Sequence, residues 1–170
     1  MQIRFAGIGG QGVVLAGVVL GEAAAIEGLN VLQTQDYSSA SRGGHSIADV
    51  IISNEPIYDV MVTRADVLVA LHQLGYDTVK ESLKEDGLLI VETDLVKPDR
   101  PYVGAPFTRI AEGTTGLALT VNMVALGYFV AKTGVVKKES VEEAIRRRVP
   151  EGTEEINIKA FRAGFEEGKK

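Results

Sequence analysis

The chain has no cysteine and no tryptophan among its 170 residues. Without cysteine it cannot form a disulfide, a thiolate zinc site or a cysteine-ligated iron–sulfur cluster, so any such cluster must sit on another polypeptide. Its two histidines, His45 and His72, lie on different segments of the chain. The sequence therefore indicates neither a metal site nor a pair of a nucleophile and its base. No G-x-S-x-G motif surrounds a serine, and hydrolase chemistry is therefore disfavoured.

Positive charge and long apolar runs are also scarce. The net charge is −5, and glutamates bracket the one basic run, Arg146 to Arg148, so a nucleic-acid partner is disfavoured. The longest apolar stretch, Leu117 to Ala131, is broken by polar residues and glycine and is too short to span a bilayer. The N-terminus lacks the pattern of a secretory signal. We expect a cytoplasmic protein with no membrane partner.

Hydrophobic residues make up 45% of the chain, which is enough for the core of a single domain spanning residues 1–170. The N-terminal pattern predicts a strand over Ile3 to Gly7, a helix over Val13 to Ile26 and a strand over Asn30 to Gln35. A right-handed crossover should make the two strands parallel. The polar link from Tyr37 to His45 is too short for a crossover helix, so the strand Ile47 to Ile52 is expected to run antiparallel.

The rest of the chain alternates strands and helices. In order we predict a strand at Asp66 to Leu71, a helix at Tyr76 to Glu85, a strand at Gly87 to Glu92, an edge strand around Tyr102 and Val103, a helix at Ala118 to Lys132, a helix with a capping box at Ser140 to Glu143, and a helix at Glu154 to Glu167. These elements predict an α/β fold with three layers, α/β/α, that is Rossmann-like and has a mostly parallel sheet, mixed where one strand reverses.

The first glycine loop, Gly7 to Gly12, matches G-x-G-x-x-G between a strand and a helix. Its candidate residues are Gly7, Gly9, Gly10, Gln11 and Gly12. Glycines let the backbone turn sharply and leave amide groups at the helix N-terminus, where they can hold a phosphate or a carboxylate. The alternative is a tight turn with close packing and no ligand.

Asp36 raises the rival hypothesis of a free-standing, NAD-binding oxidoreductase. It lies about 24 residues beyond Gly12, where a ribose-binding acid is expected, but no helix follows it to complete a nucleotide-binding half. An acidic α/β scaffold without a ligand is a third alternative.

The second glycine loop runs from Ser41 to Ser46, and its candidate residues are Ser41, Arg42, Gly43, Gly44 and Ser46. The Arg42 guanidinium, which is flanked by glycines and hydroxyl side chains, could bind a phosphate or the carboxylate of a partner. The alternative is a solvated loop with a salt-bridged arginine.

Taken together, the first glycine loop and the stretch from Gln35 to Ser46 resemble the γ subunit of 2-oxoacid:ferredoxin oxidoreductases. The similarity continues through Ala48 to Ser53, Pro56 and Ile57, Ala65 to Val69, and Asn122 to Gly127. Val14 to Gly17 and Gln33 to Gln35 look most like the 2-oxoglutarate branch, although the pyruvate, branched-chain and indolepyruvate branches share the core pattern. The sequence departs from the family at Ser38 to Ser41, where a glycine-proline-glutamate type run is usual.

The resemblance implies a complex that converts a 2-oxoacid and coenzyme A to acyl-CoA and carbon dioxide. Thiamine diphosphate, magnesium and iron–sulfur clusters are then expected on α and β subunits and on a ferredoxin-like δ subunit or domain, with no cofactor and no catalytic residue on this chain. Asn122 joins the candidate residues through this similarity, and both glycine loops are expected to meet a partner or its coenzyme A. Whether the isolated chain forms a homodimer stays an open question.

Overall fold

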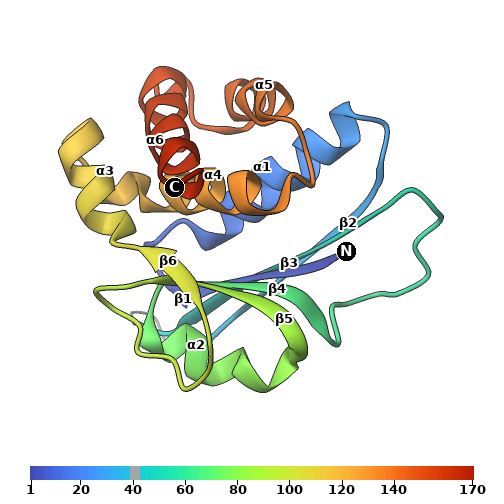
Figure 1. The fold of residues 1–170 in the computed structure, drawn as a ribbon. Helices are drawn as coiled ribbons and strands as arrows, with labels where there is room; N and C mark the ends of the chain where they lie inside the picture. Colours follow the sequence, from blue (N-terminus) through green and yellow to red (C-terminus); the bar gives the residue numbers. More distant parts are fainter. Residues whose placement is uncertain (39–42) are drawn as a thin grey trace.

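A mixed sheet of six strands forms the middle of the molecule (Figure 1). The structure, a computed structural model, describes residues 1–38 and 43–170. In spatial order the strands are β2 (Asn30–Tyr37), β3 (His45–Ser53), β1 (Gln2–Ile8), β4 (Ala65–Ala70), β5 (Leu83–Glu92) and β6 (Val103–Ala105). β1, β4, β5 and β6 pair in parallel, whereas β3 is antiparallel to both of its neighbours. The prediction of a mostly parallel, mixed sheet is confirmed.

β3 lies between β1 and β2, which corrects the predicted strand–helix–strand unit. β1 and β2 run in the same direction, because both are antiparallel to β3, but they are not neighbours. The link between β2 and β3 cannot hold a crossover helix, so β3 returns beside β2 with Tyr37 opposite Ser46. β3 takes the inner position because it is buried on both faces, with Val50 in one hydrophobic cluster and Ile51 in the other.

The helices cover the two faces of the sheet unequally. They are α1 (Val13–Ile26), α2 (Gln73–Val79), α3 (Phe107–Thr115), α4 (Val121–Thr133), α5 (Lys138–Arg148) and α6 (Glu154–Gly168), with 3-10 turns η1 (Lys80–Ser82) and η2 (Ala118–Thr120). Figure 1 shows α1 and α3 to α6 on one side and α2 alone on the other. The three layers are therefore as predicted. Within the described ranges, no helix combines the length and the apolar character needed to cross a bilayer.

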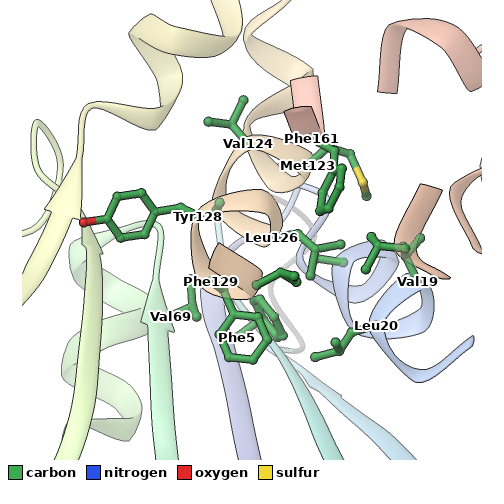
Figure 2. Packing of buried hydrophobic residues seen from close by; sticks show 14 of the residues in the cluster. Phe5, Val19, Leu20, Val69, Met123, Val124, Leu126, Tyr128, Phe129 and Phe161 are labelled. Carbon is green, nitrogen blue, oxygen red and sulfur yellow. The ribbon is translucent and has the colours of Figure 1, made fainter. Parts of the chain in front are cut away.

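α4 is the centre of the larger core, and every residue from Val121 to Val130 is buried. Figure 2 shows its side chains between the sheet and α6, where Phe129 meets Phe5 edge to face with ring centroids 5.7 Å apart. A Cβ added at Gly127 would lie 2.1 Å from the carbonyl oxygen of Phe161, so α4 and α6 cross at close range. This packing holds the N-terminus of α4 in a defined place above the sheet.

Two helices start at positions that their local sequence does not predict. The helix predicted at Tyr76 to Glu85 forms with other bounds. α2 starts earlier, where the His72 ring accepts a hydrogen bond from the Leu74 N–H (3.1 Å), and β5 already begins at Leu83. α3 was not predicted. Its N-terminus is capped by the buried Glu92 carboxylate at the end of β5, which accepts hydrogen bonds from the Thr108 N–H (2.6 Å) and hydroxyl (2.8 Å).

The capping box predicted at Ser140 to Glu143 is also wrong. α5 begins two residues earlier, and Ser140 is a buried residue inside its first turn. The N–H of Lys137, just before the helix, donates instead to the Glu27 carboxylate at the end of α1 (2.6 Å). Tertiary contact therefore decides where this helix begins.

Candidate functional site

The candidate site lies where β1 and β4 end. The chain leaves β1 toward β3 and β2 and later returns as β4 on the opposite side of β1, which makes this point a topological switch in the sheet. Ligands of open α/β sheets bind at the carboxyl ends of strands that flank such a switch. The first glycine loop follows β1 here, and the segment from Leu71 to Gly75 follows β4.

The first glycine loop makes a tight turn into α1. Gly10 and Gly12 have φ angles of 90° and 70°, which side chains rarely adopt, and the Gln11 N–H closes the turn onto the Ile8 carbonyl (3.2 Å). Gly9 and Gly10 are exposed, and within the described ranges no hydrogen-bond acceptor is paired with the Gly10 or Gly12 amide. α1 also has no side-chain cap. The loop therefore presents free donors at a helix N-terminus, as a phosphate or a carboxylate requires.

The side chain of Gln11 braces this turn. Its carbonyl oxygen accepts a hydrogen bond from the Ile8 N–H (2.9 Å), and its amide nitrogen donates to the Leu71 carbonyl (3.0 Å). It thereby ties the loop after β1 to the loop after β4. Of the predicted site residues, Gln11 thus holds the shape of the site.

Asn122, at the N-terminus of α4, holds the other side of the first glycine loop. Its side-chain nitrogen donates to the Gly12 carbonyl (3.1 Å), and a Cβ at Gly12 would lie only 2.4 Å from that nitrogen. Only 3% of Asn122 is exposed. The structure therefore places Asn122 beside the loop, where glycine leaves the room that its amide needs.

Gly75 is a part of the site that the sequence motifs did not indicate. A Cβ there would lie 2.5 Å from the Gly7 nitrogen, so α2 is pressed directly against the backbone at the end of β1. Tyr76 and Lys80 then anchor α2 to Asp99 through hydrogen bonds of 2.5 and 2.6 Å. These two donors hold the pKa of Asp99 at about 2, below its ordinary value of 3.8. The sequence signal that could have indicated this contact is a glycine three residues after the histidine that caps α2.

The second glycine loop meets the first through the backbone. The Gly9 N–H donates to the Gly44 carbonyl (3.1 Å), and Gly43 has a φ angle of 69°. Ser46 is buried in β3 opposite Gly7. The predicted glycine positions of the two loops are therefore neighbours in space. The remaining two candidate residues, Ser41 and Arg42, lie outside the described residues.

The geometry does not support the NAD hypothesis or a metal centre. Asp36 lies on β2, two strands and thus about 9–10 Å from β1, whereas a ribose-binding acid follows the strand directly beside β1. Asp36 faces His45 instead (3.4 Å), while the His72 ring caps α2. In the described part of the chain, no group of three histidine or carboxylate side chains could hold a metal ion.

The sequence pattern of the family described as "Pyruvate ferredoxin/flavodoxin oxidoreductase" matches residues 2–167. The chain belongs to this family. Among its relatives is the 2-oxoglutarate synthase subunit KorC of Methanocaldococcus jannaschii, which is 46% identical over 99% of this chain and 94% of its own length.

Two solved structures share the fold. The γ subunit of a keto/oxoacid ferredoxin oxidoreductase from Geobacter sulfurreducens is 44% identical, with a TM-score of 0.86 over 98% of this chain and 95% of its own. The 2-oxoglutarate:ferredoxin oxidoreductase of Magnetococcus marinus, solved with 2-oxoglutarate, coenzyme A and succinyl-CoA, is 23% identical, with a TM-score of 0.88. The match covers 99% of this chain but 31% of that longer one, and at this identity it shows the fold alone.

Proposed function

We propose that this chain is the γ subunit of a 2-oxoacid:ferredoxin oxidoreductase that acts on 2-oxoglutarate. The complex oxidatively decarboxylates the 2-oxoacid with coenzyme A to acyl-CoA and carbon dioxide, and ferredoxin takes up the electrons. The observation that carries this proposal is the 46% identity to a 2-oxoglutarate synthase subunit over nearly the whole of both chains. The whole of residues 1–170 acts as one γ-type domain in a cytoplasmic complex.

In this proposal the chain is not catalytic. The iron–sulfur clusters sit on partner subunits, because this chain has no cysteine to ligate them, and thiamine diphosphate and magnesium sit on the α and β partners. The candidate site supports this division, since its described members are glycines, one serine and two amides, which cannot transfer protons at neutral pH.

The proposed role of the glycine loops is to admit coenzyme A at the interface with a partner. The free amides of Gly10 and Gly12 offer donors to a phosphate, and Arg42, from its place in the sequence, supplies a positive charge.

Reconstitution of the complex tests the main proposal. The chain is co-expressed with candidate α, β and δ subunits of the complex, the complex is purified through a tagged partner, and coenzyme A-dependent ferredoxin reduction is measured with 2-oxoglutarate, pyruvate, branched-chain 2-oxoacids and indolepyruvate. We expect co-purification and a preference for 2-oxoglutarate. Tight NAD binding by the chain alone, or turnover of a 2-oxoacid without its partners, would contradict the proposal.

Substitution at Gly9 tests the role of the loop. Gly9 is exposed, no described atom lies within 4 Å of an added Cβ, and its φ angle suits other residues, so Gly9→Asp adds a negative charge without disturbing the fold. A unit charge about 4 Å from a phosphate costs roughly 1 kcal/mol in water, so the KM for coenzyme A should rise about fivefold while the KM for the 2-oxoacid stays constant. Gly113→Asp, equally free of neighbours on α3, is the matched control. An equal coenzyme A KM in both variants would exclude the loop from binding.

A further inference from the structure

The two edges of the sheet differ in how they are protected against pairing with another chain. β6, at one edge, has three residues and is flanked by Pro101 and Pro106, and short strands and prolines are common protections of a sheet edge. β2, at the other edge, has eight residues, contains no proline or lysine, and pairs with β3 in an unbroken register. An edge of this length and regularity is a template for a further strand.

The backbone groups on the outer side of β2 belong to alternate residues. The Ser38 N–H donates to the His45 carbonyl (3.0 Å), so in the β2–β3 ladder the even-numbered residues of β2 direct their N–H and C=O groups toward β3. The groups of Val31, Gln33 and Gln35 therefore point away from the sheet. Within the described ranges, no strand pairs with them.

The side chain of Gln33, in the middle of β2, carries an unsatisfied donor. In the described part of the chain, its amide nitrogen is the only buried side-chain nitrogen or oxygen without a hydrogen-bond partner. The nitrogen lies on the α1 side of the sheet, where a Cβ added at Gly17 would be 3.6 Å away. A buried amide left unpaired lowers stability, and an acceptor that arrives along the outer edge of β2 would remove this cost.

A hollow beside Gln33 opens at the same edge, between α1 and β2. Its charged residues, Glu22 and Arg148, are paired with each other, so it presents small and apolar side chains together with the amide of Gln33. It therefore suits a neutral side chain from an added strand. The lining residues are Val18, Gly21, Glu22, Ala25, Val31, Gln33 and Arg148.

β2 is complementary to itself when two copies pair antiparallel about a two-fold axis at Gln33. In this register Gln33 faces Gln33 of the second copy and Val31 faces Gln35, so the outward N–H and C=O groups of all three residues find partners. The two Gln33 side chains share one face about 5 Å apart, where each amide nitrogen reaches the other's carbonyl. Asp36, the only charged residue of β2, faces Asn30, so no like charges are opposed.

We propose that this chain forms a two-fold dimer in which the two β2 strands pair about Gln33 and join the sheets of both copies into one. A register centred two residues to either side would shorten the overlap and separate the two glutamines. The dimer does not depend on the proposed function, because it uses no residue of the candidate site. A strand of a partner subunit is the other occupant that the test must separate.

The first test measures the mass of the purified chain by light scattering over a concentration series. We expect a species of twice the 18.2 kDa of one chain. Gln35→Pro removes an outward N–H from each copy but leaves the β2–β3 ladder intact, so the dissociation constant of the dimer should rise about tenfold or more. Gln35→Ala keeps that N–H and is the matched control. A monomeric wild type, or equal dissociation constants for the two variants, would overturn the dimer.

Cysteine cross-linking tests the register and also decides the matter if Gln35→Pro does not fold. Because the chain has no cysteine, Gln33→Cys adds a single thiol, and in the dimer the two Cα atoms lie about 5.5 Å apart, within reach of a disulfide. The two thiols of Gln35→Cys would lie about 14 Å apart along the strands and should stay reduced. We expect mild oxidation to cross-link Gln33→Cys alone.

The remaining outcomes exclude the proposed dimer. Cross-linking of both cysteine variants to the same extent, or of neither, would overturn the register and the dimer with it. The same thiol of Gln33→Cys is also treated with a maleimide in the co-expressed complex. Protection of the thiol there, without a cross-link between two copies of this chain, would assign the edge to a partner subunit and equally overturn the dimer.

Discussion

Substitution of Gly75 by alanine measures how tightly α2 is pressed against the end of β1. The added Cβ would lie 2.5 Å from the Gly7 nitrogen and 2.8 Å from the Ala6 carbonyl carbon, which are backbone atoms inside a paired strand. Because these atoms cannot rotate away, overpacking should cost about 2–3 kcal/mol. Alanine returns at most about 0.5–1 kcal/mol of helix propensity, so the expected loss is about 2 kcal/mol, or roughly 4–8 °C in Tm for a chain of this length.

Gly113→Ala is the matched comparison, because Gly113 is also a helical glycine but no described atom lies within 4 Å of its added Cβ. It should raise Tm by about 1–4 °C through helix propensity alone. The measurement is thermal unfolding of the purified chain followed by circular dichroism. Equal shifts in the two variants, or a stabilised Gly75→Ala, would refute the argument that backbone contact at the site requires glycine.

Two further predictions concern ion pairs. Arg4 and Asp49 are nearly buried and joined by two hydrogen bonds of 2.7 Å, so Asp49→Ala should lower the free energy of unfolding in urea by about 3–5 kcal/mol. Replacing both residues by leucine should cost clearly less, because no unpaired charge is then left buried. A double variant as unstable as Asp49→Ala would contradict this. The pKa of Asp99 is depressed to about 2, so its contribution is present above about pH 4 and is lost as the pH falls toward 2. The stability difference between wild type and Asp99→Asn should therefore shrink over that range, and a difference independent of pH would contradict it.

Much of the fold was predictable because local and global preferences agree. α1 has the predicted bounds, Val13 to Ile26, since apolar residues at helical spacing follow a glycine loop and Gly28 terminates the pattern. The antiparallel course of β3 followed from the length of one link. α6 and the edge strand β6 also form where predicted.

The starts of α2, α3 and α5 were not predictable from local sequence. The groups that accept hydrogen bonds from the N–H groups at these starts are either distant in the sequence or residue types that rarely cap a helix. The Glu92 carboxylate serves α3, Glu27 pairs just before α5, and a histidine ring serves α2. A local capping rule considers only the neighbouring side chains, so it selected Ser140, which is buried inside the helix. The position of β3 between β1 and β2 likewise follows from the burial of both its faces.

For the candidate site, the sequence by itself determined which residues can form it: glycines that permit a left-handed turn, free amides at the start of α1, and no cysteine to hold a cluster. Only the tertiary structure decided that Gly44 meets Gly9, that Asn122 and Gln11 brace the loop, and that Gly75 touches Gly7. The physical reason is that backbone conformation depends on each residue type and its neighbours, whereas these contacts join segments up to 110 residues apart and exist only once the sheet order and the packing of α4 bring them together.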